Sequence, residues 1–211
     1  VVRSRGLGDV YKRQIIYRKF YIYIMAIRIK SKWSKTVKRA KTTDDVASAL
    51  SYIGWKISLD KAKNLHGEDF EYTSDHQRIT VIVEYMSFQV HIADRLMYLD
   101  NKKSEYRTEV MNKLGTYSSA IMQENCEDLF GQGDYKTGYI KTLNLRSTEY
   151  SNYEFSPKER NYSIYRHLAL KVQEAMGYSQ TNKWIMDQIV DIEAVEVCNK
   201  IVSVYKSLTA S

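Results

Sequence analysis

The sequence predicts an all-α protein: a single six-helix, bundle-like domain over residues 42–208, with a central apolar helix at about residues 74–99. Three observations support this fold class. Apolar residues recur at helical spacing in six segments. The 211 residues include only one proline and nine glycines, the residues that most often interrupt helices. Strand-like alternation is confined to Ala26–Lys30. Because two or three alternating residues cannot build a sheet, we expect helices alone.

Signals at the segment ends set the expected helix bounds. Thr42–Asp45 and Ser74–Gln77 resemble capping boxes, and Asp134 is a further N-cap candidate. Ser156–Glu159 combines an N-cap, a proline at the first helical position and the box glutamate, which predicts a fifth helix start. Gly131–Gly133 follows a helix and lacks the lysine of a phosphate loop, so it is expected to be a turn. The expected helices cover about residues 42–65, 74–99, 104–130, 134–150, 156–177 and 181–208.

The last helix is expected to bury one stripe of side chains at helical spacing. These are Trp184, Ile185, Gln188, Ile192 and Val195. With no linker composition between the six segments, one domain is the natural count.

The first residues of the chain differ in character from the domain. Residues 4–14 read SRGLGDVYKRQ, and their back-translation resembles a transposase sequencing adaptor that ends in its mosaic end. We therefore interpret residues 1–24 as a disordered translation artefact from assembled shotgun reads, with the gene product starting at Met25. A genuine basic extension is the alternative.

Charge is unevenly distributed along the chain. The formal net charge is +7, of which residues 1–24 carry +5 and the basic arm at residues 25–41 carries a further +7. Residues 42–211 therefore sum to −5, so the body is acidic. The arm, with Trp33 in its middle, would suit weak, salt-dependent binding to nucleic acid or to an acidic surface. A solvated terminus is the alternative, and we favour it.

Compartment and membrane topology follow from a few residues. Cys126 and Cys198 lack CxxC spacing and nothing resembles a secretion signal, which favours free thiols in the cytoplasm. The most apolar window, Ile79–Leu99, holds four ionisable residues. Because ionisable groups are costly in a bilayer, this window is expected to be a buried helix rather than a membrane span.

Polar residues share one face of the central predicted helix. Glu84, His91 and Asp94 are spaced by seven and three residues, and Arg95 lies beside them. Such a row offers ligands for one metal ion or groups for carboxylate–histidine catalysis. A di-iron bundle, in contrast, needs Glu-x-x-His pairs, and the chain has none.

The alternative interpretation is structural, since buried charges persist only when they are paired. Acids at spacing four on the third and sixth predicted helices are expected to face Arg95 or His91. These acids are Glu124, Asp128, Asp187 and Asp191. We favour this ion-pair network over a catalytic site, and we predict no bound metal and no cofactor.

Tyrosines crowd the region between the third and sixth predicted helices. Tyrosine is amphipathic and suits half-buried surfaces, so the fourth and fifth helices are expected to bind a protein partner or a second copy of the chain. Rims of packed helices would use the same residue type. The residues expected to make this face are Tyr139, Tyr150, Tyr162 and Tyr165.

Three motifs bear on ancestry. With them, the chain resembles a family of uncharacterised proteobacterial proteins over residues 25–208. The motifs are Glu84-Tyr85 with His91-Ile92-Ala93-Asp94-Arg95, Gly131-Gln132-Gly133-Asp134-Tyr135, and Trp184 with Asp187-Gln188 and Asp191-Ile192-Glu193. The resemblance implies a bacterial source and a start near Met25, and it brings no activity. We expect a soluble binding or regulatory module rather than an enzyme. The alternatives are an enzyme or metal protein with its site on the central helix, and binding through the basic arm.

Overall fold

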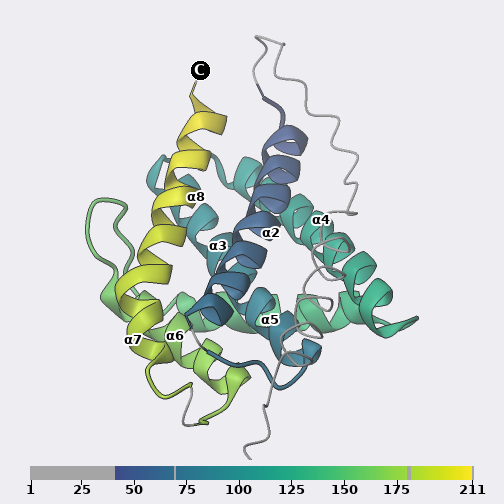
Figure 1. Ribbon diagram of the computed structural model, residues 1–211. Coiled ribbons are helices and arrows are strands. Elements are labelled where there is room, and N and C mark those ends of the chain that lie inside the picture. The colour runs from purple at the N-terminus through teal and green to yellow at the C-terminus, as the bar shows by residue number, and fades with distance from the viewer. Residues whose placement is uncertain (1–40, 69, 180–181, 211) are drawn as a thin grey trace, which may run out of the picture. The chain divides into compact units, whose positions relative to one another are not determined.

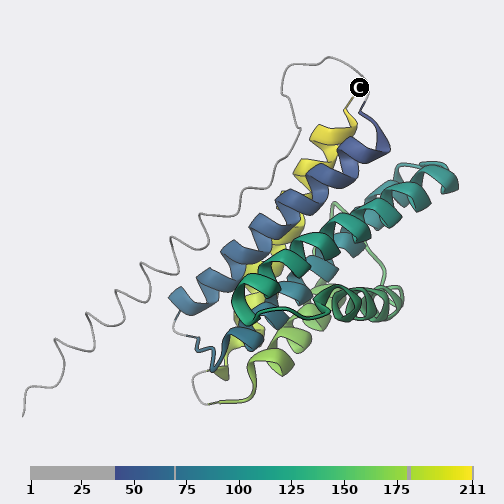
Figure 2. The same ribbon diagram turned by 90° about the vertical axis from the view of Figure 1, so that its right-hand side faces the viewer.

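The structure is a computed structural model that describes residues 41–68, 70–179 and 182–210, all within the unit that comprises residues 33–211. The described elements are all helical (Figures 1 and 2). They are α2 (Thr43–Gly67), α3 (Asp75–Leu99), α4 (Ser104–Phe130), α5 (Tyr135–Tyr150), α6 (Tyr162–Met176), α7 (Ile185–Gln188), the π-helix η2 (Ile189–Glu193) and α8 (Ala194–Thr209). Residues 1–24, and the arm up to residue 40, lie outside the described residues, so the adaptor and arm interpretations stay predictions.

The α3 helix is the centre of the fold, as its apolar sequence predicts. It packs against α2, α4, α5, α6 and α8, and every residue from Val81 to Ala93 is buried. A helix that is buried on all sides has no polar face, which explains why its sequence lacks an amphipathic pattern. Figure 2 shows α2, α4 and α8 running along one direction, with α5 crossing them.

Local capping signals predicted four of the helix starts or stops. Thr42 and Asp45 form a complete capping box, Ser74 Oγ accepts from the Gln77 amide, and Asp134 accepts from the Thr137 amide. Gly131 ends α4 with φ +85°, a conformation that glycine adopts without strain. These contacts join residues at most four apart, so the sequence alone is sufficient to specify them.

The expected helix start at Ser156–Glu159 is wrong. The Asn161 side chain instead closes this segment into a loop: its Oδ1 accepts from the Ser156 amide (2.8 Å), and its Nδ2 donates to the Ser156 and Glu159 carbonyls (2.8 and 3.0 Å). A side chain that forms hydrogen bonds with the backbone groups of a turn competes with helix formation. The α6 helix therefore begins only at Tyr162.

The sixth expected helix is present as the continuous run α7–η2–α8, so the described residues hold six long helices in total. Its expected core stripe is partly wrong, because Ile185 is buried but Ile192 and Trp184 are 46% and 63% exposed. A π turn contains more residues than an α turn, which rotates the residues after it relative to α7. That rotation turns Ile192 outwards and Glu193 inwards.

Two further expectations are answered by the described residues. Cys126 and Cys198 are buried and free. Within residues 41–68, 70–179 and 182–210, no helix combines the length and the apolar character that a membrane crossing requires.

Candidate functional site

Glu84, the first residue of the expected cluster, is sealed by an arginine from α5. Arg146 binds both oxygens of the buried Glu84 carboxylate, with Nε–Oε2 at 2.7 Å and Nη2–Oε1 at 2.8 Å. Its remaining Nη1 donates to Glu149 at 2.9 Å. The bidentate geometry is the strongest that an arginine and a carboxylate form, and the pair raises the pKa of Arg146. Glu84 therefore serves as the anchor of Arg146.

His91 lies in the core as a neutral imidazole. Its ring stacks on Tyr150 with the centroids 5.2 Å apart, and its side chain is 4% exposed. Burial, together with the neighbouring Arg95 charge, lowers the pKa of His91 to about 4. Its Nε2 has no hydrogen-bond partner among the described residues. Removal from water thus determines the protonation state of His91.

Asp94 and Arg95 pair with residues that the sequence did not indicate. Asp94 binds Arg107 of α4 at 2.8 Å, and Arg95 donates to the Ser151 carbonyl at 3.4 Å rather than to a carboxylate. The four acids expected to meet Arg95 or His91 are instead exposed, because they lie on the outer faces of their helices. They are Glu124, Asp128, Asp187 and Asp191.

The eight expected residues are therefore not gathered into one site, and the expected pairing of Arg95 or His91 with the four acids is absent from the described residues. Glu84 and Asp94 are both paired, each with an arginine of another helix. Among the described residues, no three His, Cys, Asp or Glu side chains are arranged to hold a metal ion.

A chain of polar contacts continues from Arg146 to the surface. Glu149 Oε2 lies 2.9 Å from His167 Nε2, and His167 Nδ1 lies 3.2 Å from the Tyr153 hydroxyl. A carboxylate on one imidazole nitrogen and a hydroxyl on the other is the order of groups in which a histidine can accept a hydroxyl proton. Tyr153 is half-buried, so its side chain is the part of this arrangement that reaches toward solvent.

The expected tyrosine face on α5 and α6 is largely wrong. Tyr139, Tyr150 and Tyr165 are 3%, 0% and 3% exposed, and only Tyr162, at 56%, faces outwards. Tyr150 is enclosed by His91 and by His167, whose ring centroid is 5.0 Å away. These tyrosines are core residues, and burial raises the pKa of Tyr165 to about 12.

A buried ion pair at η2 was not among the sequence predictions. Lys61 of α2 is fully buried, and its Nζ lies 2.7 Å from Glu193 Oε2 and also binds Glu196. Burial opposes its charge, but the bonds to both glutamates outweigh burial and raise the pKa of Lys61. A lysine at core spacing between Ile57 and Leu65 was the available signal. Its partner depends on the π turn, which is not readable from the sequence.

On its outer side, η2 borders an open hollow of about 300 Å³. We call it the η2 hollow; it lies between the Asn161-closed loop and the start of α8. Arg160 Nη2 spans it, binding Asp191 and donating to the Val190 carbonyl at 3.3 Å. Asp191, one of the expected site residues, thus lines this hollow. The lining residues are Pro157, Lys158, Glu159, Arg160, Tyr165, Asp191, Val195 and Asn199.

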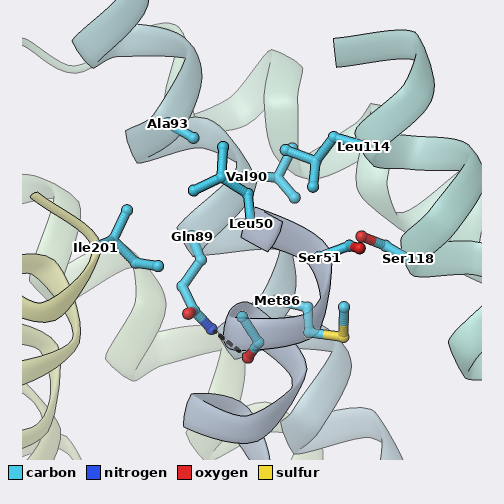
Figure 3. Close-up of a pocket in the computed structure, with 10 residues that line it drawn as sticks. Leu50, Ser51, Met86, Gln89, Val90, Ala93, Leu114, Ser118 and Ile201 are labelled. Atoms are coloured by element: carbon cyan, nitrogen blue, oxygen red, sulfur yellow. Dashed lines mark hydrogen bonds between the residues drawn. The ribbon is translucent and has the colours of Figure 1, made fainter. Parts of the chain in front are cut away.

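A second space, of about 10 Å³, lies in the core between α2, α3, α4 and α8. Figure 3 shows the hydroxyls of Ser51 and Ser118 pointing toward each other, with Gln89 on the other side of the view. The Gln89 amide nitrogen donates to Ser58 Oγ at 2.8 Å and to the Gly54 carbonyl at 3.2 Å. This volume suits about one water molecule, so it is too small for a substrate.

Comparison of the chain with protein-family models, with curated proteins and with solved structures found no match. The resemblance to proteobacterial proteins therefore stays a prediction.

Proposed function

We propose that this chain is a bacterial, cytoplasmic protein-interaction module whose partner binds across α6, α7 and η2. One observation supports the proposal: a group of large apolar side chains is exposed on α6, on η2 and on the segment between α6 and α7. We call this group the α6–η2 surface. It consists of Tyr162, Leu170, Tyr178, Trp184 and Ile192.

The elements that carry this surface are neighbours. The α6 helix packs against both α7 and η2, and Figure 1 shows α6 and α7 side by side. Tyr178 and Trp184 are 75% and 63% exposed, so a partner would remove much apolar area from water. Large apolar side chains exposed on neighbouring elements are typical of interaction sites.

The area on offer fits a second copy of the chain. An aromatic side chain buries ~150–250 Å² when fully covered, so three aromatics that are each more than half exposed supply roughly 300–500 Å² of the ~800 Å² per partner of a stable interface. Leu170 and Ile192 extend that area. A symmetric dimer uses the same patch twice, which makes the second copy the partner that we propose.

Sedimentation velocity on the full chain tests this proposal. We expect concentration-dependent dimerisation, and we expect it to be lost when Tyr162, Trp184 and Ile192 are replaced by serine. The matched control replaces Tyr98, Leu99 and Leu145, which are 57%, 46% and 54% exposed and lie on α3 and α5. A monomer at every concentration, or equal weakening by both triple variants, contradicts the proposal.

A second candidate function, acid–base chemistry, is favoured by the Glu149–His167–Tyr153 contacts. If His167 accepts the phenolic proton, the Tyr153 oxygen becomes a nucleophile, and Glu149 holds the imidazole in orientation. This candidate resembles the enzyme site expected from the sequence in having a carboxylate–histidine pair next to the central helix. Its groups, however, lie on α5, α6 and the loop between them.

An aryl sulfonyl fluoride, which labels activated tyrosines with loss of fluoride, is a direct probe. We expect Tyr153 to be labelled faster than Tyr178, although Tyr178 is far more exposed, and we expect His167→Gln to remove that advantage. Peptide mapping by mass spectrometry measures both rates. Labelling that simply follows exposure rules out activation by His167.

A further inference from the structure

The η2 hollow has the features of a small-ligand site. We propose that it binds a carboxylate attached to an apolar group, and that Arg160 holds the carboxylate. Two sources share this chemistry: a small free acid, and the C-terminal residue of a peptide. The proposal goes beyond the interaction function above and does not depend on it.

Arg160 is only partly used by the protein. A single nitrogen, Nη2, contacts both Asp191 and the Val190 carbonyl, whereas Nε and Nη1 bond to no described residue. The guanidinium carries five donors in a rigid fork that matches a carboxylate, and this side chain is 54% exposed. The Nε and Nη1 donors of Arg160 are therefore available to an acceptor from solution.

Asp191 occupies the place that a ligand carboxylate would take. Its side chain is 64% exposed, and exposed ion pairs contribute little to stability. An incoming carboxylate can therefore displace Asp191 into water with only a small loss. Lys158, on the same loop, adds a second cation, and Glu159 disfavours ligands with more than one negative charge.

The remaining wall residues are Asn199, which is polar, and three with apolar or aromatic surface. Pro157, Val195 and the ring of Tyr165 line the hollow, and Tyr165 is held in the core. Its volume, about 300 Å³, lies at the lower end of the ~300–1,000 Å³ range of ligand sites. An apolar group of a few carbons fits this space better than a large ring system.

The backbone on both sides of the hollow is set before any ligand arrives. Asn161 closes residues 156–161 with three hydrogen bonds, and the π turn presents Val190 and Asp191 toward that loop. Short π segments occur frequently at functional sites. Preorganisation of this kind reduces the entropy that binding has to overcome.

The test is an NMR titration of the full, ¹⁵N-labelled chain with two probes, sodium hexanoate and the peptide N-acetyl-Gly-Gly-Leu. The same peptide with a C-terminal amide is the control ligand. We expect amide shifts confined to residues 158–160 and 190–195. Binding by hexanoate alone identifies a free acid as the ligand, and tighter binding of the peptide identifies a C-terminus.

Variants of Arg160 and Asp191 are expected to change ligand affinity in opposite directions. Arg160→Met is expected to weaken binding more than tenfold, whereas Asp191→Asn is expected to tighten it by about threefold because the internal competitor is gone. Arg166→Met, which changes an exposed arginine of α6, is the matched control. The melting temperature of each variant shows that the fold is retained.

Several results overturn the proposal. It fails if neither carboxylate probe shifts the hollow, if the amide peptide binds as well as the acid, or if Arg160→Met binds normally. Weaker binding by Asp191→Asn also contradicts it, because Asp191 would then be part of the site rather than a competitor.

Discussion

Individual charged residues in this fold are kept in the core by partners from other helices. Lys61 of α2 reaches Glu193 of η2, and Glu84 of α3 reaches Arg146 of α5. The sequence shows that such charges need partners, but it does not show which ones. Arg107 and Arg146 were missed for this reason, since their pairing depends on how α3 lies against α4 and α5.

The buried pair at Lys61 gives the first prediction. Lys61→Met leaves the Glu193 carboxylate in the core without its cation, which is expected to cost about 3–5 kcal/mol. Adding Glu193→Met removes the stranded charge, so the double variant is expected to recover most of that loss. Urea unfolding of both variants measures the difference. A double variant as unstable as Lys61→Met shows that packing, not charge, dominates at this position.

His91 gives the second prediction, on pH. The unfolded chain binds a proton at His91 below pH 6.5, but the folded chain does so only near its pKa of about 4. Acid therefore favours unfolding: the stabilisation is complete above pH 6.5 and is lost as the pH falls to about 4. The loss is at most about 3 kcal/mol. Unfolding free energies from pH 4 to 8 should fall less steeply for His91→Phe, and parallel profiles contradict the assignment.

At the scale of elements, the contrast between α2 and η2 shows what the sequence determines. The capping box at Thr42 and Asp45 joins neighbouring residues, so the pattern was sufficient. The Ser156–Glu159 pattern was equally clear but lost to Asn161, whose side chain offers the loop more bonds. The π turn was not predictable, because it depends on how α7 and α8 pack in the core.

The glycines of α5 and α6 give the third prediction. Gly138 lies within α5 with open space around the place of a Cβ, so Gly138→Ala is expected to stabilise the fold by about 0.5–1 kcal/mol. Gly177 ends α6 with φ +79°, where a Cβ is strained, and Gly177→Ala is expected to destabilise by about 1–2 kcal/mol. Thermal unfolding measures both, and shifts of the same sign contradict the backbone argument.

At the scale of the whole molecule, the six-helix, all-α class and the central position of α3 were predictable, because they follow from apolar spacing over long segments. The candidate sites were not. They depend on contacts such as Arg160 to Asp191 and Glu149 to His167, which join residues 18 or more apart in the chain. Three of the four tyrosines of the expected face are buried, because composition does not show which residues the packing covers.

The adaptor interpretation gives the fourth prediction. A chain that starts at Met25 is expected to melt at the same temperature as the full chain, because translated adaptor has no evolved contact with the domain. Differential scanning calorimetry compares the two. A melting temperature that is lower by several degrees shows that residues 1–24 belong to the fold.

The Lys41 ammonium donates to the Ser207 carbonyl at 2.6 Å, so the backbone that leads into α2 lies beside the last turn of α8 (Figure 1). Domains whose two ends meet are tolerated as insertions within other proteins. Residues 41–209 are therefore suited to being spliced into a surface loop of a fluorescent host protein. In such a chimera, the proposed ligand binding at the η2 hollow or the proposed dimerisation is expected to change the fluorescence of the host.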